Sequence, residues 1–310
     1  MTKRKNKSRN NFVEYNKQMF KDYKKSIKHA IFDETLTLYI LRPIAFVFVK
    51  MLYPTNITPN QVSLITIIVG IISGYFFSRG TLTCFVLGGS LYFLCMVTDC
   101  VDGMIARLKN SGTAVGRIID GFADYVVGIS AYVGLGIGLS ISGHQLSFSL
   151  NISHWTLLGI AAVSQIFHSM LVDYYRNEFM SHGMGKRKST WEDKKHFTEE
   201  LDKIKHKKGN LLEKILIGGY LGYSHLQVFH LDEKEEYDSE KYYGANHMLI
   251  RLWFWIGPTA HAFVFIISAI LYRPIIFFIY TIGVANIWMI VLWIIQVKKN
   301  KKILITSNCL

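Results

Sequence analysis

Six long apolar runs divide the chain and limit the folds that it can adopt. They fall at about 60–79, 83–106, 117–141, 154–174, 250–271 and 274–296. Each is close to the roughly 20 apolar residues that an α-helix needs to cross a bilayer. Because a globular core does not require six such runs in succession, the sequence predicts an all-α, polytopic membrane protein with six transmembrane helices.

Lys and Arg are distributed in a way that predicts the side of the membrane on which each loop lies. Residues 1–35 hold ten of them, residues 175–247 hold thirteen, and the tail after Val297 holds four. The loops at 80–82 and 142–153 hold none. Because Lys and Arg accumulate on the cytoplasmic side, we expect both termini there, in the plasma (inner) membrane.

The formal net charge of +13 also raises the question of a nucleic-acid partner. Nucleic-acid-binding chains combine a basic patch with a groove-reading module, and the sequence shows no such module. Membrane topology and adhesion to anionic lipid headgroups account for the charge. We therefore expect membrane lipids, and no nucleic acid, as partners.

Composition divides the chain into three parts. Residues 1–55 are expected to form a basic cytoplasmic arm and an interfacial amphipathic helix. Residues 56–297 are expected to form the six-span membrane domain, which contains a cytoplasmic insert at about 175–247. Residues 298–310 are expected to form a basic cytoplasmic tail.

Two segments between these landmarks are expected to lie at the membrane surface. Residues 36–53 are too interrupted to cross the bilayer, and Arg42 and Lys50 would extend their charges to the headgroups from an interfacial helix. An apolar patch at 211–229 in the insert is too short and glycine-rich for a span, and it favours a pair of surface helices.

Four aspartates lie within 26 residues of otherwise apolar sequence: Asp99, Asp102, Asp120 and Asp124. Buried carboxylates in a membrane are costly and are usually retained for function. Four together cannot all stay ionised without a cation. A separation of three residues places the first pair about 60° apart on a helix, and a separation of four places the second pair about 40° apart.

Because one pair ends the second span and the other opens the third, both pairs should point into one gap at headgroup depth. Hard oxygen ligands in this number favour Mg²⁺ or Mn²⁺. Two ions close together would form the clamp that is used in phosphoryl transfer. The alternative is a structural cluster in which Arg107 and Arg117 neutralise carboxylates between helices, although two arginines cannot balance four aspartates.

The spacing around these aspartates resembles the signature of the CDP-alcohol phosphatidyltransferase family. All eight fixed positions are present, namely Asp99, Asp102, Gly103, Ala106, Arg107, Gly116, Asp120 and Asp124. The resemblance implies transfer of a phosphatidyl or other phosphoalcohol group from a CDP-linked lipid, such as CDP-diacylglycerol, to an acceptor hydroxyl. CMP would be released, in phospholipid biosynthesis, and a homodimer is the expected assembly.

The resemblance also implies roles for individual residues. It implies that Asp99, Asp102 and Asp120 bind one ion, and that Asp99, Asp120 and Asp124 bind a second. Asp124 would also be the catalytic general base. Nucleotide contacts are implied for Gly103, Arg107 and Thr113, and more loosely for the segment from Asn60 to Ser63. Gly116 is expected to clear space for the nucleotide or for the facing helix.

The acceptor is left open, and a bare amino alcohol, a polyol phosphate and a lipid all remain candidates. Its pocket is expected beside Asp124, and the candidate lining residues are His168, Asp173, Arg176 and Arg251. Ordinary positive-inside flanking also explains the two arginines. A hydrogen bond to a neighbouring helix also explains His168.

Two other functions share part of this pattern. A cation transporter could use the aspartates as a transit site, and it would place them near the bilayer midplane among broken or repeated helices. A catalytically silent scaffold of the same fold would be expected to lose Asp124 first, and Asp124 is present.

Overall fold

The computed structural model describes residues 17–27, 33–143, 152–185 and 237–304. Within these ranges the chain is helical, and its one β-contact is an isolated bridge between Tyr237 and Leu304. The predicted all-α class is therefore confirmed. The start of the arm, the end of the tail and most of the insert, with the apolar patch at 211–229, lie outside the described residues.

The described residues begin with a helix over 17–26, and thirteen further helical segments follow it, counting the π and 3₁₀ segments. In chain order they are η1 (Thr37–Leu41), α2 (Arg42–Leu52), α3 (Pro59–Ser78), α4 (Leu82–Lys109), α5 (Ala114–Ser142), α6 (His154–Glu178), η2 (Phe179–Gly183), α9 (Ser239–Trp253), η3 (Phe254–Ile256), α10 (Pro258–Ile270), α11 (Ile275–Phe278), η4 (Ile279–Val284) and α12 (Ala285–Ile303).

Six stretches among these helices are long and apolar enough to cross a membrane. They are Pro59–Ser78, Leu82–Lys109, Ile118–Ser142, His154–Gly183, Ser239–Ile270 and Ile275–Ile303. All six predicted spans are confirmed, and the protein is an integral membrane protein. The fifth is longer than expected because α9, η3 and α10 follow one another with a break around Gly257.

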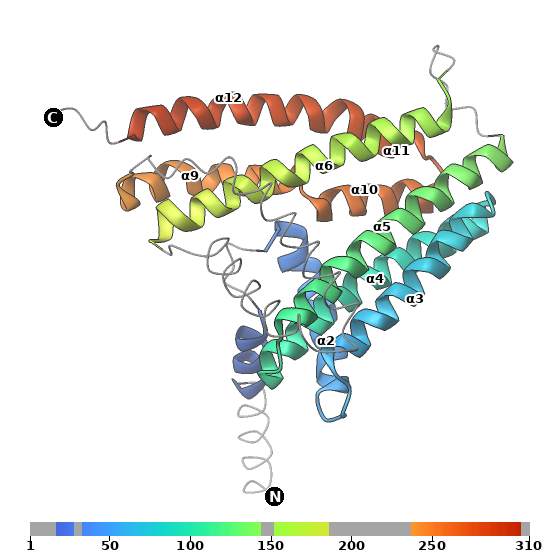
Figure 1. Ribbon diagram of the computed structural model, residues 1–310, viewed down its shortest axis with the longest axis horizontal. Helices are drawn as coiled ribbons and strands as arrows, with labels where there is room; N and C mark the ends of the chain where they lie inside the picture. Colours follow the sequence, from blue (N-terminus) through green and yellow to red (C-terminus); the bar gives the residue numbers. More distant parts are fainter. Residues whose placement is uncertain (1–16, 28–32, 144–151, 186–236, 305–310) are drawn as a thin grey trace, which may run out of the picture.

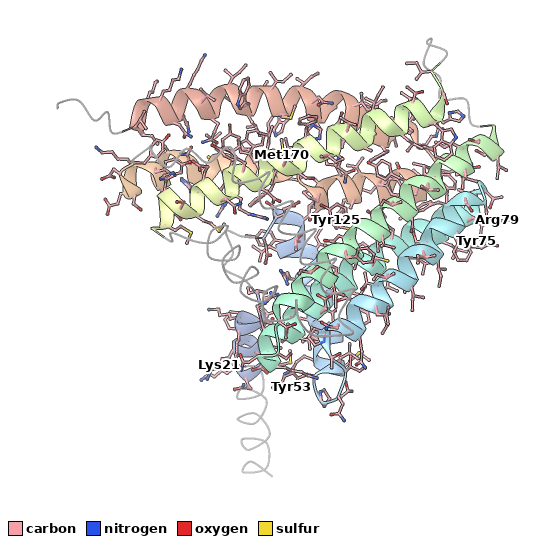
Figure 2. All side chains as sticks on the ribbon, in the orientation of Figure 1. Lys21, Tyr53, Tyr75, Arg79, Tyr125 and Met170 are labelled. Carbon is pink, nitrogen blue, oxygen red and sulfur yellow. The ribbon has the colours of Figure 1, made fainter. Side chains whose placement is uncertain are left out.

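Large apolar side chains cover the outer faces of these helices. Tyr75, Tyr125 and Met170 are examples, with 59%, 65% and 46% of their surface exposed, and they project away from the helices that carry them (Figure 2). Exposed apolar surface on this scale is typical of a protein whose outside is covered by lipid chains.

Helices α3, α4 and α5 lie side by side and form the first group of spans (Figure 1). The α3 and α5 backbones touch at glycines. A Cβ atom on Gly134 would lie 2.1 Å from the carbonyl oxygen of Gly74, and one on Gly138 would lie 2.1 Å from that of Phe77. Small residues allow this close approach, which brings the first turns of α3 and α5 together beside the end of α4.

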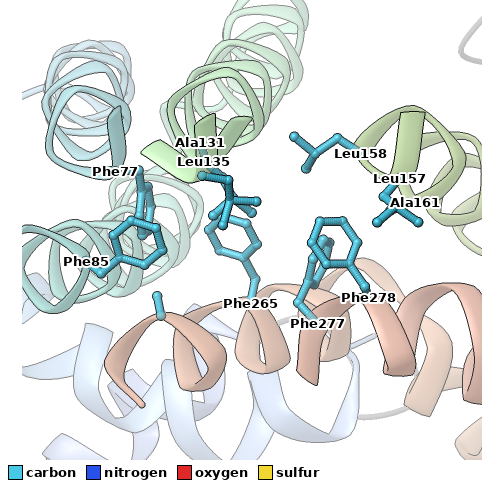
Figure 3. Packing of buried hydrophobic residues seen from close by; sticks show 12 residues of the cluster. Phe77, Phe85, Ala131, Leu135, Leu157, Leu158, Ala161, Phe265, Phe277 and Phe278 are labelled. Atoms are coloured by element: carbon cyan, nitrogen blue, oxygen red, sulfur yellow. The ribbon is translucent and has the colours of Figure 1, made fainter. Parts of the chain in front are cut away.

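The remaining spans, α6, α9–α10 and α11–α12, form a second group that packs against the first (Figure 1). An aromatic cluster joins the two groups (Figure 3). Its largest buried members are Phe77, Phe85, Phe265, Phe277 and Phe278. Helix α10 also contacts α4, so the second group supports the helix that carries Asp99 and Asp102.

Helix α2 lies against α4 rather than only at the membrane surface. Ala45 and Val49 are fully buried in a cluster with Met104 and other α4 side chains. The expectation that Arg42 extends to the headgroups is wrong, because Arg42 is buried and binds Asp33 with two hydrogen bonds of 3.1 and 2.8 Å. A buried guanidinium requires such a partner.

Candidate metal and nucleotide site

The aspartates are brought together by the tight turn between α4 and α5. Thr113 caps α5 by accepting a hydrogen bond of 2.9 Å from the Gly116 backbone N–H. At the other end of the turn, Asn110 adopts a left-handed conformation with φ of 50°. Because asparagine tolerates this conformation at a helix C-cap, the chain reverses within residues 110–113.

Three of the four carboxyl groups converge. Asp99, Asp102 and Asp120 each offer an oxygen atom, and these oxygens lie within 4.8 Å of one another. Asp102 is buried and accepts a hydrogen bond of 2.5 Å from the Ser63 hydroxyl on α3. Asp124 lies one helical turn beyond Asp120 on the exposed side of α5, next to the Asp99 carboxyl.

The chemistry of this donor set fits a divalent ion. All the donors are carboxylate oxygens, which Mg²⁺ and Mn²⁺ prefer. Oxygens bound to one Mg²⁺ lie about 3–4 Å apart, given bonds of about 2.0–2.1 Å. A cluster spread over 4.8 Å needs only small side-chain rotations to reach this arrangement.

A cavity of about 70 Å³ adjoins the aspartate cluster. Its lining comes from α3, from the end of α4, from the turn and from the start of α5. The lining residues are Pro59, Asn60, Ser63, Asp102, Gly103, Ala106, Ser111, Gly112, Thr113, Gly116 and Asp120. Five of the six residues predicted to contact the nucleotide are among them, and so are two of the predicted metal ligands.

Gly116 has to be small in this arrangement. A Cβ atom at this position would lie 3.0 Å from Asn60 Oδ1 and 3.1 Å from Thr113 Oγ1. Both contacts are tighter than ordinary van der Waals packing, so a side chain here would displace two polar groups that line the cavity. The side chain of Arg117 lies outside the described part of the structure.

Arg107 is the sixth predicted nucleotide contact and is not one of the residues that line this cavity. Its guanidinium is next to Gly103, where a Cβ atom would lie 3.4 Å from both Nη1 and Nη2. Nε donates a hydrogen bond to the Ser26 backbone carbonyl. Nη2 is buried and has no hydrogen-bond partner within the described ranges. A buried cationic donor without a partner is costly, and an anion beside Gly103 would satisfy it.

The residues considered for the acceptor pocket have partners of their own. The His168 ring is buried and lies 3.0 Å from His261 between ring nitrogens. Arg176 forms an ion pair of 2.7 Å with Asp173. The first contact supports the interpretation that His168 bonds a neighbouring helix. Both positive-inside flanking and an acceptor role for Arg176 stay predictions.

Sequence reasoning missed the contribution of the segment before α2. Ser26 contacts Arg107, Asp33 neutralises Arg42, and Glu34 accepts a hydrogen bond of 3.0 Å from the Thr259 backbone N–H at the start of α10. No spacing within the aspartate motif indicates these residues, because each contact joins residues outside the motif or reaches it from far along the chain.

Residues 56–191 match the family model of CDP-alcohol phosphatidyltransferases. This segment contains the first four spans, the aspartate cluster and every lining residue of the cavity. The similarity to a CDP-alcohol phosphatidyltransferase domain thus covers residues 56–191 of the 310. The comparison with curated proteins found no match. The match implies a transferase of the CDP-alcohol phosphotransferase type and supports a role in lipid biosynthesis.

Proposed function

We propose that this protein transfers a phosphatidyl or related phosphoalcohol group from a CDP-linked lipid to an acceptor hydroxyl and releases CMP. The observation that carries the proposal is the position of the carboxylate cluster. It adjoins a cavity lined by Asn60, Ser63, Gly103, Thr113 and Gly116, within the segment that matches the family.

In this proposal, Asp99, Asp102 and Asp120 hold one Mg²⁺ or Mn²⁺ ion, and Asp99, Asp120 and Asp124 hold a second. When bound, the ions would neutralise the negative charge of the diphosphate and of the departing CMP. The Ser63 hydroxyl fixes the orientation of Asp102 by its hydrogen bond, as partners of a ligand commonly do.

The remaining residues bind the nucleotide and move the proton. Gly103 and Gly116 leave space for CMP in the cavity, and Arg107 offers its unpartnered Nη2 to a phosphate. The acceptor oxygen attacks the phosphorus that stays with the lipid alcohol, and the P–O bond to CMP breaks. Asp124, on the exposed side of the cluster, takes the proton of the acceptor hydroxyl.

The proposal places the active site and both termini on the cytoplasmic side of the plasma (inner) membrane, on the basis of the Lys and Arg distribution. It keeps 56–297 as the membrane domain and a homodimer as the assembly. The transporter alternative gains no support, because the aspartates belong to the ends of two unbroken helices, α4 and α5. The break in the fifth span lies instead at Gly257.

Purified protein incubated with Mg²⁺, CDP-diacylglycerol and a panel of alcohol acceptors tests the proposed function. We expect CMP release that depends on one acceptor and stops when the metal is chelated. If CMP is released with none of the acceptors, and the protein instead moves Mg²⁺ into liposomes, the transporter reading replaces the proposal.

Asp124→Asn tests the general base. We expect kcat to fall roughly 10³-fold, within the range that general base catalysis contributes, while CMP binding in Mg²⁺ stays within about threefold of wild type because the amide keeps an oxygen ligand. Asp238→Asn is the matched control, because Asp238 caps α9 and asparagine also caps helices. Normal turnover by Asp124→Asn would remove this residue from the mechanism.

A further inference from the structure

The helix over 17–26 ends against the predicted nucleotide site, although it lies outside the segment that matches the family. Ser26, its last residue, is fully buried. The backbone carbonyl of Ser26 accepts a hydrogen bond from Arg107 Nε. An element from outside the family domain therefore contacts a residue that the proposed function assigns to nucleotide binding.

This contact fixes the direction of the Arg107 guanidinium. The group is planar and presents its donors as a rigid fork. With Nε held by Ser26, the two Nη atoms lie beside Gly103, which lines the cavity. Nη2 is the buried donor that lacks a partner within the described ranges. The carbonyl thus holds the positive charge of Arg107 toward the space where a phosphate would bind.

Several contacts hold this helix in place against α2. The Tyr23 ring packs edge-on against Phe46 with centroids 5.1 Å apart. Asp22 forms an ion pair of 2.8 Å with Lys50. The Ser26 hydroxyl donates a hydrogen bond of 2.7 Å to the Tyr23 carbonyl and closes the last turn. Because α2 packs on α4, the helix over 17–26 is braced against the helix that carries Arg107.

We propose that the helix over 17–26 is a positioning element for Arg107, and that through the Ser26 carbonyl it sets the affinity of the active site for the CDP-linked lipid. The inference rests on the proposed function for its substrate, but it concerns residues that the family domain does not include. The contacts that hold this helix run to α2 and to Arg107, so we expect it to act on nucleotide binding and not on proton transfer.

Ser26→Leu in the full-length chain tests this inference. The larger side chain cannot fit a fully buried position, so the last turn must move and the carbonyl must leave Nε. We expect KM for the CDP-lipid to rise roughly tenfold, which corresponds to the lower end of what a hydrogen bond to a charged group contributes. KM for the acceptor and kcat at saturation should change less than twofold. If Ser26→Leu fails to fold, Tyr23→Ala takes its place, because it loosens the same helix and should also raise KM for the CDP-lipid.

Lys24→Ala is the matched control, because Lys24 lies on the exposed face of the same helix. It should leave KM for the CDP-lipid unchanged. In an Arg107→Ala background, Ser26→Leu should add nothing to KM, since the residue through which it acts is gone. If the helix only stabilises the fold, Ser26→Leu would instead lower the melting temperature and kcat equally in the wild-type and Arg107→Ala backgrounds.

Binding of CMP in the presence of Mg²⁺, followed by the shift in melting temperature, separates this inference from the proposed function. Weaker CMP binding by Ser26→Leu supports the inference even if no tested acceptor gives turnover. Unchanged KM and unchanged CMP binding in Ser26→Leu overturn it and leave the transferase proposal intact. A wild-type protein that binds no CMP overturns both.

Discussion

At the scale of single residues, the protein buries polar groups in matched pairs. Ser63 binds Asp102, Asp33 binds Arg42, and the Thr259 backbone binds Glu34. Each partner offsets the cost of removing a polar group from water. Arg107 Nη2 departs from this rule within the described ranges, and it lies beside the cavity. An unmet buried donor of this kind is expected where a ligand completes the site.

Glu34 gives the stability of the protein a dependence on pH. Burial raises the pKa of Glu34 from 4.5 to about 7, although a hydrogen bond from Thr259 opposes the shift. In the unfolded chain the carboxyl loses its proton near the lower value. Between pH 4.5 and about 7, the folded state therefore binds more protons than the unfolded state. The stabilisation that protonated Glu34 gives is complete below pH 4.5 and is lost as the pH rises to about 7.

We expect Glu34→Gln to remove this loss, because the amide is neutral at every pH and can still accept from the Thr259 N–H. Above pH 7 the variant should gain on the order of 3 kcal/mol relative to wild type. The measurement is the difference in melting temperature between the two proteins at pH 5 and pH 8. Equal differences at both pH values would show that Glu34 does not titrate in this range.

At the scale of helices, the site depends on how closely α3 and α5 approach. Helix α3 supplies Asn60 and Ser63, and α5 supplies Asp120 and Gly116. Their separation is set farther along both helices, where glycine backbones touch. A change in that contact alters the distance between the two walls of the cavity without changing a residue that lines it.

Gly134→Ala should therefore disrupt the protein from a distance. The new methyl group would lie 2.1 Å from the Gly74 carbonyl oxygen, so the helices must separate. We expect a loss of about 1–3 kcal/mol in stability, with a fall in CMP binding. Gly128→Ala on the same helix is the control, because a Cβ there meets nothing within 4 Å. It should stabilise α5 by up to about 1 kcal/mol. The melting temperatures of the two variants test both predictions. Similar melting temperatures for Gly134→Ala and Gly128→Ala would contradict the close-contact explanation.

At the scale of the whole molecule, the family segment and the later spans form one packed unit. The match to the family ends at residue 191, while α10 and α11 contribute Phe265, Phe277 and Phe278 to the aromatic cluster that joins the two groups (Figure 3). The last two spans therefore support the site without lining its cavity. The insert at about 175–247 joins them to the family segment and lies mostly outside the described residues.

The arrangement of charge along the chain predicts the side of the membrane on which the site lies. Ser111 is exposed in the turn between α4 and α5, and Thr83 is exposed at the opposite end of α4. In a chain with Cys84 and Cys309 replaced by serine, we expect Ser111→Cys to react with an impermeant thiol reagent only from the cytoplasmic side. Thr83→Cys should react only from the other side, and the reverse pattern would refute the predicted topology.

The six spans and the two aspartate pairs at facing helix ends could be predicted from the amino-acid sequence. Both follow from short-range properties, since apolar length sets a span and a separation of three or four residues sets a helix face. The contacts of Ser26 with Arg107, 81 residues apart, and of Glu34 with Thr259, 225 residues apart, depend on how the helices pack and could not be predicted in this way. Arg42 illustrates why such contacts are missed. A charged residue near a predicted membrane interface is predicted from sequence to be exposed. In the structure Arg42 is buried in an ion pair with Asp33, on a helix that packs against α4.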